Sequence, residues 1–268
     1  RVGITFVHEV REKTGLSAAD VARAYSISRE VFDVRSLYDA IEGLDNVVPA
    51  ALQIAMLTEC GRLIERASVW FLRQAAQPLD IAHEIATYRD GVKEITEHLL
   101  PLLSQGNADT VRDRTAKLVA DGVPEDLALR AASLPFLMPA CDIVRIAHGA
   151  GQPVLDIARV YFAIGTRFGF DWLRAAAARL PSDNAWDKLA VSAIVDDLYG
   201  HQSELTARVV EGTEELSAPD TVIEHWAAAR RSLVSRTDQL LAELQTLSTL
   251  DLAMLAVANR QLRAMVDS

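Results

Sequence analysis

Apolar side chains recur along this chain every three or four residues, which is the spacing of one helix face. The pattern begins with Ile4, Val7 and Val10, and it predicts a helix over residues 4–14 that ends at Gly15. Nowhere do apolar and polar residues alternate over a stretch long enough to predict a strand. The chain is therefore predicted to be all-α, with long amphipathic helices.

Capping residues and prolines mark several of the expected helix starts. Ser17 is followed three residues later by Asp20, as in a capping box. A long helix is expected over residues 47–74, with Pro49 in its first turn. Its apolar stripe should consist of Ile54, Leu57, Ile64, Ala67 and Phe71. Further on, a short helix should start at Pro78, and another should run from about residue 90 to Pro101.

The second half of the chain reads as helices separated by glycine and proline signals. Turns or caps are expected at residues 106–107, 122–124, 134–139 and 149–153. The helices beyond them are expected at about residues 154–168, 171–179, 184–210, 218–246 and 249–265. Gly165 and Gly169 lie within this helical pattern and follow no strand, so they indicate helix packing or a bend, not a dinucleotide-binding loop.

The sequence also repeats itself at a distance of 136 residues. DVARAY at residues 20–25 returns as DIARVY at residues 156–161. The same offset matches three further pairs: Phe32 with Phe168, Leu37 with Leu173, and Leu44 with Leu180. Repeats of this kind are supersecondary units that bury their apolar faces against one another. An internal duplication is therefore predicted: a multi-helix bundle of two similar helical units, residues 1–105 and 153–268, joined by a helical connector at residues 106–152.

Composition and charge narrow the range of partners. Of the 268 residues, half are hydrophobic and only 6% aromatic, which favours aliphatic helix packing. The net charge of −10 repels phosphate backbones and anionic membranes, so neither nucleic acid nor a membrane is an expected partner.

Cys60 and Cys141 lack metal or redox spacing and are expected to be buried free thiols. With no signal peptide visible, a cytoplasmic setting is expected. Because the chain opens on Arg1, it is expected to be a piece of something longer.

Few residues carry candidate chemistry. Asp197, His201 and Glu204 share one helix face and could form part of a metal site, although a solvated surface stripe is the simpler interpretation. Residues 15–22 could open a helix-turn-helix, but residues 24–30 continue the same helix. The four tryptophans have apolar neighbours and are expected in the core: Trp70, Trp172, Trp186 and Trp226. Replacing Trp172 by alanine should then destabilise the fold by roughly 3–5 kcal/mol.

Several stretches resemble the C-terminal region of the large bacterial NAD-specific glutamate dehydrogenases. They are GITFVHEVREKTG (3–15), REVFDVRSLYDAIEGLDNVVPAALQIAMLTECGRLIERASVWFLR (29–73), PEDLALRAASLPFLMPACDIVRIA (124–147), DIARVYFAIGTRFGFDWLR (156–174) and VDDLYGHQSELT (195–206). No single stretch is chemically diagnostic. Their order along nearly the whole chain, thinning after about residue 211, carries the resemblance.

This resemblance implies a very large, cytoplasmic, homo-oligomeric enzyme that oxidises L-glutamate to 2-oxoglutarate and ammonia and reduces NAD⁺. The chain would be its α-helical C-terminal domain, and its partner would be the catalytic domain of the same polypeptide. The family's catalytic lysine and NAD-binding domain belong upstream. None of the four lysines here (Lys13, Lys93, Lys117 and Lys188) lies in a matching motif. No catalytic, cofactor-binding or metal-binding residue is therefore expected in this chain, and its role would be structural, in oligomerisation, or regulatory.

Two other interpretations stay open from the residues themselves. The chain could be a free-standing helical binding or adaptor module that holds a partner between its two units. It could also be a helical enzyme with a metal site around Asp197 and His201.

Overall fold

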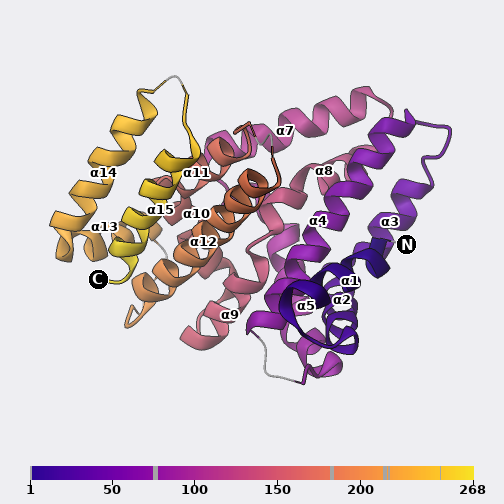
Figure 1. Ribbon diagram of the computed structural model, residues 1–268, viewed down its shortest axis with the longest axis horizontal. Coiled ribbons are helices and arrows are strands. Elements are labelled where there is room, and N and C mark those ends of the chain that lie inside the picture. Colours follow the sequence, from indigo (N-terminus) through magenta and orange to yellow (C-terminus); the bar gives the residue numbers. More distant parts are fainter. Residues whose placement is uncertain (1, 75–77, 182–183, 214–215, 217, 248) are drawn as a thin grey trace. The chain divides into compact units, whose positions relative to one another are not determined.

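The structure is a computed structural model of the chain (Figure 1). It describes residues 2–74, 78–181, 184–213, 216, 218–247 and 249–268. The described residues form α-helices and one 3₁₀ helix, and no strand occurs among them, so the prediction of an all-α chain is confirmed. The first helices are α1 (Val2–Thr14), α2 (Ala18–Val31), α3 (Val34–Glu42), α4 (Ala50–Gln74), α5 (Ile81–Glu97), α6 (Leu99–Leu102), α7 (Gln105–Ala120), α8 (Glu125–Ser133), η1 (Leu134–Leu137) and α9 (Ala140–Ala150). The later helices are α10 (Val154–Arg167), α11 (Phe170–Ala177), α12 (Ala185–Val210), α13 (Pro219–Ala229), α14 (Arg231–Gln245) and α15 (Leu252–Val266).

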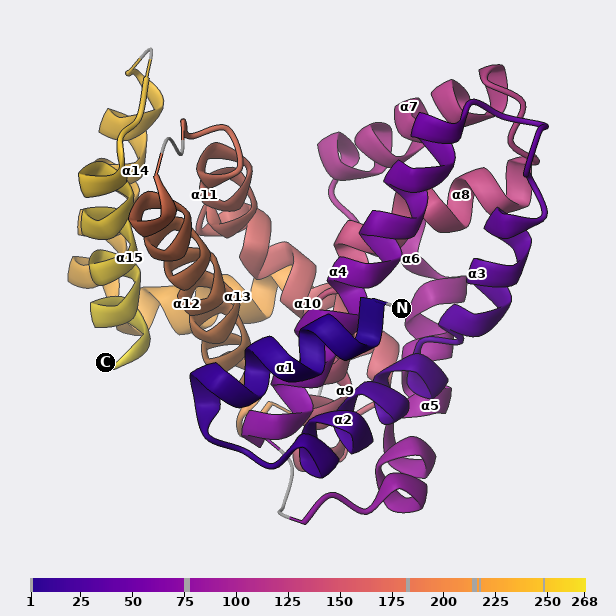
Figure 2. The same cartoon turned by 45° about the vertical axis from the view of Figure 1, so that its right-hand side comes forward.

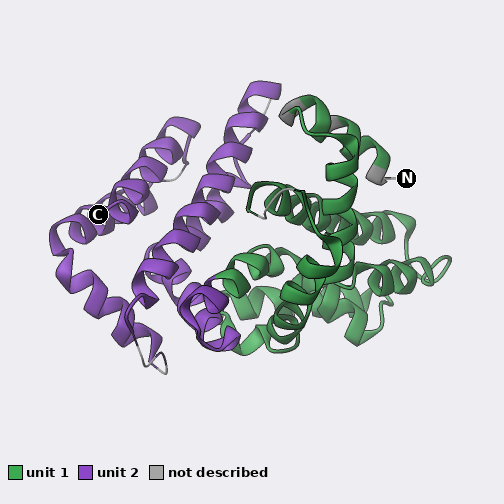
Figure 3. Cartoon of the chain, turned by 90° about the horizontal axis from the view of Figure 1, so that it is seen from below, with its two compact units in different colours: residues 1–145 green, residues 146–268 purple. Residues whose placement is uncertain are grey.

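The contacts within the chain divide it into two compact units, residues 1–145 and 146–268 (Figure 3). In this division, residues 106–145 of the expected connector belong to the first unit, and the boundary falls inside α9. The domain limits proposed from the sequence, at residues 105 and 152, stay a prediction.

In the first unit, α2 packs against α4 and α5, and these helices lie together in Figures 1 and 2. The buried face of α2 carries Val21, Ala24 and Ile27, each with no exposed surface. Ser28 and Ser68 are equally buried at the contact with α4, where the Ser68 hydroxyl donates to the Ser28 hydroxyl at 3.2 Å. Small and aliphatic side chains thus allow the close approach that builds this core.

In the second unit, α10 packs against α12 and α13, and α12 also contacts α15. Figure 2 shows α12 and α15 side by side. The core contains Tyr161, Phe168 and Phe170, each at most 1% exposed. Gly165 lies where α10 approaches α12: a Cβ there would lie 2.7 Å from Nε2 of Gln202. The prediction of helix packing at Gly165 is therefore confirmed, because only glycine leaves room for that amide.

Helix ends follow the capping signals closely. The Ser17 side chain accepts a hydrogen bond from the Asp20 backbone N–H at 3.1 Å, as the capping box predicts. Gly15 has a φ of +71°, the left-handed conformation expected where α1 ends. Asn184 caps α12 by accepting from the backbone N–H groups of Trp186 and Asp187, both at 2.9 Å.

Two elbows between consecutive helices have the same design. Between α2 and α3, Asp33 has a φ of 45°, and between α10 and α11, Gly169 has a φ of 72°. Each follows a phenylalanine C-cap, Phe32 or Phe168. Helices α2 and α10 begin at residues 18 and 154, and α3 and α11 at residues 34 and 170, so the offset of 136 residues holds for both pairs. The bend expected at Gly169 is confirmed, whereas an internal duplication of the chain stays a prediction.

Four expected helix boundaries differ from the structure. The break expected near residue 90 is absent, and α5 continues through Gly91, whose missing Cβ makes room for the Val144 side chain. The helix expected at residues 218–246 is interrupted at Arg230, whose φ is −121°. Residues 106–107, expected to form a turn, lie in the first turn of α7, which is capped by Ser104. Helix α4 begins at Ala50, one residue after Pro49 and three later than expected.

Two expectations about the core also need correction. Ile54, assigned to the buried stripe of α4, is 62% exposed, and Leu57 is only half-buried. The buried face of α4 consists of Met56, Cys60, Leu63, Ile64, Ala67, Ser68 and Phe71. The four tryptophans differ widely: Trp226 is 6% exposed, Trp70 and Trp172 are half-buried, and Trp186 is 78% exposed. A loss of 3–5 kcal/mol, which assumes full burial, therefore no longer follows for Trp172→Ala.

Within the described parts of the chain, no single helix combines the length and apolarity needed to cross a bilayer. Two helical segments joined by a 63° bend, Glu125–Leu137 and Ala140–Ala150, meet these criteria only as a pair. Buried core helices of globular domains pass the same test, and Cys141, Ile143 and Val144 are at most 3% exposed.

Candidate functional site

A buried polar cluster of the second unit lies where α10, α11 and α12 meet. Gln202 of α12 has no exposed surface, and its Nε2 donates to the backbone carbonyl of Tyr161 on α10 at 2.8 Å. Asp171 and Arg174 of α11 form an ion pair, with Arg174 Nη2 2.5 Å from Asp171 Oδ1. A Cβ on Gly165 would meet both Gln202 Nε2 and, at 2.9 Å, Asp171 Oδ1. The three helices are therefore joined around one buried polar cluster.

Arg174 stays charged in this cluster although its side chain is only 14% exposed. Burial disfavours the charged guanidinium, but Tyr199, Tyr161 and Asp171 outweigh that effect and raise the pKa of Arg174 above its usual value. The guanidinium carbon also lies 4.3 Å from the centre of the Tyr199 ring, a cation–π contact. These contacts join α10, α11 and α12, so the cluster is suited to fixing helix positions, although Gln202 Oε1 and Arg174 Nη1 are buried without a hydrogen-bond partner among the described residues.

The sequence did not predict this polar cluster, although a signal was present. Leu198, Gln202 and Leu205 occupy helical positions on the same buried face of α12. A glutamine between two leucines on an apolar face indicates a buried hydrogen bond, because a buried amide without a partner is costly.

The three residues of the candidate metal site, Asp197, His201 and Glu204, differ in burial: the two carboxylates are exposed and the histidine is buried. Asp197 and Glu204 are exposed: Asp197 accepts from Asn259 Nδ2 at 2.9 Å, and Glu204 pairs with Arg208 at 2.8 Å. His201 is only 7% exposed, so the interpretation of these residues as a solvated surface stripe was wrong for the histidine. Burial lowers the pKa of His201 below its usual value. Among the residues that the structure describes, no group of three or more His, Cys, Asp or Glu side chains is placed to hold a metal ion.

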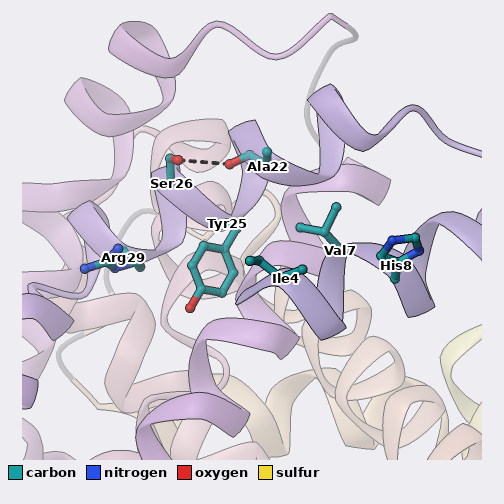
Figure 4. A pocket seen from close by; sticks show the side chains of 7 residues that line it. All are labelled: Ile4, Val7, His8, Ala22, Tyr25, Ser26 and Arg29. Atoms are coloured by element: carbon teal, nitrogen blue, oxygen red, sulfur yellow. Dashed lines mark hydrogen bonds between the residues drawn. The ribbon is translucent and has the colours of Figure 1, made fainter. Parts of the chain in front are cut away.

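A hollow of about 440 Å³ lies between α1 and α2 in the first unit (Figure 4). It is lined by Ile4, Val7, His8, Ala22, Tyr25, Ser26 and Arg29. In Figure 4, Ile4 and Tyr25 lie side by side, and the Ser26 hydroxyl donates to the Ala22 carbonyl of its own helix at 2.9 Å. Ile4 is 74% exposed, so the hollow is open and partly apolar. The described residues that line it are apolar or neutral polar apart from His8 and Arg29, and they offer a partly apolar contact surface.

A second hollow, of about 580 Å³, lies in the second unit between the end of α12 and α13. Its lining includes Trp226, Arg230, Arg208 and His225. The Arg230 guanidinium carbon lies 4.5 Å from the centre of the Trp226 ring, and Arg208 is already paired with Glu204. Arg230 and Trp226 therefore stabilise the junction of α13 and α14 by packing. The lining also includes Glu211, along with His225 and the paired Arg208.

Both cysteines are free and buried, as expected from the sequence. Burial raises the pKa of Cys60 to about 12, and it raises the pKa of Cys141 well above the usual value. A thiol reacts as its thiolate, so neither group is poised as a nucleophile. The absence of catalytic, cofactor-binding and metal-binding residues from the chain stays a prediction.

The described residues are thus helical in their regular structure, and the buried polar cluster of the second unit joins three of the helices. Comparison with known families matches residues 1–264 to the family described as "Glutamate dehydrogenase, C-terminal". The chain therefore belongs to this family, and the resemblance seen in the sequence is confirmed.

Individual relatives agree with this assignment. The NAD-specific glutamate dehydrogenase of Pseudomonas aeruginosa is 35% identical over 267 residues, which is 100% of this chain. That of Mycobacterium tuberculosis is 32% identical over 98% of the chain, and that of Halomonas elongata 29% identical over 100%. In each case the chain spans only 16% of the relative's length. It corresponds to the C-terminal region of these much longer proteins.

Proposed function

We propose that this chain is the non-catalytic helical domain of an enzyme that converts L-glutamate, NAD⁺ and water to 2-oxoglutarate, ammonium, NADH and a proton. The observation that carries the proposal is the match of residues 1–264 to the C-terminal glutamate dehydrogenase family, together with the 16% share of each relative's length. Catalysis and NAD binding then take place in the rest of the polypeptide. The polar cluster at Gln202 and Arg174 supports this role, because Gln202 bonds to the Tyr161 carbonyl and Arg174 pairs with Asp171, contacts that are internal to the domain.

The experiment compares the 268-residue chain with the longer polypeptide that carries it. Glutamate-dependent formation of NADH is followed at equal molar concentrations, and NAD⁺ binding is measured by equilibrium dialysis. Turnover and NAD⁺ binding are expected from the longer polypeptide alone. Turnover by the 268-residue chain would refute the division of roles.

The proposal extends to the setting and assembly of the enzyme. We propose a cytoplasmic protein of amino-acid catabolism that forms homo-oligomers, in which this domain braces the catalytic domain or contributes contacts between subunits. Two buried free thiols and the acidic net charge of −10 support a reducing, aqueous compartment. Light scattering by the longer polypeptide tests the assembly, and a monomer at micromolar concentration would contradict it.

We further propose that the chain arose by internal duplication. The supporting observation is the pairing of α2 with α10 and of α3 with α11 at one offset, with a left-handed residue at each elbow. In both units, the first of these helices packs against a long helix of 25 or 26 residues, α4 or α12. Superposition of the two units from an experimental structure tests the idea, and unrelated paths of α2–α4 and α10–α12 would refute it.

A further inference from the structure

The start of α12 carries an apolar face that the described residues leave exposed. Trp186 is 78% exposed and Leu189 is 57% exposed. They lie three residues apart, and Ala193, also exposed, follows four residues later, so all three share one side of the helix. We call Trp186, Leu189 and Ala193 the Trp186 face. A large aromatic and a leucine together on an exposed helix face are typical of a site of protein contact.

The Trp186 face is held in a fixed position. Asn184 caps the helix by accepting from the N–H groups of Trp186 and Asp187, and its Nδ2 donates to Asp187 Oδ2 at 2.7 Å. Further along, α12 packs against α10, α11 and α15 in the same unit, with Ile194 and Leu198 buried. The exposed side chains therefore project from a capped, packed helix, and little conformational entropy is lost when a partner covers them.

We propose that a segment of the same polypeptide, outside these 268 residues, covers the Trp186 face. This inference rests on the proposed function, in which the chain is one domain of a much longer protein. In each relative, the matching segment is 16% of the length, so most of the protein lies elsewhere and is available as the occupant.

The size of the face favours this occupant over a second copy of the chain. A tryptophan and a leucine together offer roughly 300 Å² of contact, whereas a stable interface between separate proteins buries about 800 Å² on each partner. A docking segment in the same polypeptide is present at an effective concentration of the order of millimolar, so a smaller contact suffices. Two large apolar anchors are a sufficient contact for such intramolecular docking.

The test measures accessibility at the face in both forms of the protein. Leu189→Cys is introduced into the 268-residue chain and into the longer polypeptide, and alkylation by N-ethylmaleimide is quantified by peptide mass spectrometry. Val257→Cys on α15 is the matched control, because Val257 is also an exposed apolar residue of a helix in the same unit, at 44%. Neither substitution removes a buried side chain, so both variants should fold, and circular dichroism checks this.

In the 268-residue chain, the L189C and V257C thiols should be alkylated at rates within threefold of each other. In the longer polypeptide, alkylation of L189C should slow at least tenfold, while V257C changes less than threefold. Equal rates for L189C in the two forms, or equal protection of both positions, would overturn the proposal. Protection of L189C that grows with concentration of the 268-residue chain alone would overturn it too, in favour of a second copy as the occupant.

Glutamate-dependent NADH formation by the longer polypeptide is measured in the same preparations. Turnover with an unprotected L189C thiol would refute the docking while leaving the proposed function intact. Protection of L189C without any turnover would refute the proposed function while leaving the docking intact.

Discussion

The glycine at position 165 offers a sharp test of how the second unit is held together. In Gly165→Ala, the new Cβ would lie 2.7 Å from Gln202 Nε2 and 2.9 Å from Asp171 Oδ1. Real Cβ atoms do not approach other atoms this closely, so both side chains must move. Both side chains are held by polar contacts: the Gln202 amide donates to the Tyr161 carbonyl, and Asp171 is paired with the largely buried Arg174.

The expected loss follows from these two contacts. Leaving the buried Gln202 amide without its partner costs about 1–3 kcal/mol, and weakening the charged pair of Asp171 and Arg174 costs a similar amount. Alanine recovers about 1 kcal/mol, because glycine is the poorer helix former. Gly165→Ala should therefore lower the free energy of unfolding by about 1–5 kcal/mol, which overlaps the range of substitutions that overpack a core.

Urea unfolding followed by circular dichroism and by tryptophan fluorescence measures the change. Gly200→Ala is the control: Gly200 lies on the exposed side of α12, with nothing within 4 Å of its Cβ position. That variant should be unchanged or more stable by up to about 1 kcal/mol. In the Gln202→Ala background, Gly165→Ala should cost at least about 1 kcal/mol less, because one of the clashing groups is gone. A Gly165→Ala protein as stable as its parent would refute the account of this cluster.

The remaining predictions concern tryptophan burial, a buried histidine and the two thiols. Trp226→Ala should lower the free energy of unfolding by about 3–5 kcal/mol, and Trp172→Ala should lower it by less. Trp186→Ala should change it by no more than about 0.5 kcal/mol in the 268-residue chain. Equal losses for the three variants in urea unfolding would contradict the observed exposures. Burial, aided by Arg263 and opposed by Asp197, Glu204 and Asp267, lowers the pKa of His201 from its ordinary 6.5. Stability should therefore be complete above pH 6.5 and fall as the pH drops through the lowered value, since the unfolded chain takes up the proton first. His201→Gln should flatten this part of the pH profile, and an unaltered profile would assign the slope to other groups. Cys60 and Cys141 should react with Ellman's reagent only after denaturation, and rapid reaction of the native chain would show that the thiols are accessible.

Much of the fold could be predicted because local signals and tertiary packing agree. The Ser17 cap and the left-handed Gly15 mark their helix ends in the sequence itself, since one residue type meets a local backbone need. The elbow at Gly169 and the cap at Asn184 are also indicated by the residue types at these positions in the sequence. These features depend on residues within one helix turn of each other.

Features that depend on distant contacts could not be predicted in the same way. Gly91 resembles a helix break, yet it lies inside α5 because the Val144 side chain occupies the space beside it. The interruption at Arg230 has no proline or glycine to announce it. Burial of His201 and exposure of Trp186 are set by which helices lie next to α12, and a helical period alone does not specify them.

The polar cluster of the second unit was missed for a related reason. Asp171, Arg174 and Gln202 come from two helices, and a third, α10, supplies the carbonyl and the space left by Gly165. No single stretch of sequence contains the set. Only the buried position of Gln202 between Leu198 and Leu205 could have indicated it.

The two elbows are secured by different forces, and so they respond differently to the solution around the protein. At Asp33, the carboxylate accepts from the Ser36 hydroxyl at 2.6 Å and lies 3.9 Å from Arg130, in an exposed setting that dissolved ions screen. At Gly169, the backbone is covered by Leu241, whose Cδ1 would lie 3.1 Å from an added Cβ, and salting-out ions strengthen such apolar packing. Salt should therefore weaken the attraction between Asp33 and Arg130, whereas the packing of Leu241 over Gly169 should persist, so one backbone shape is held in the two units by contacts that differ in their response to salt.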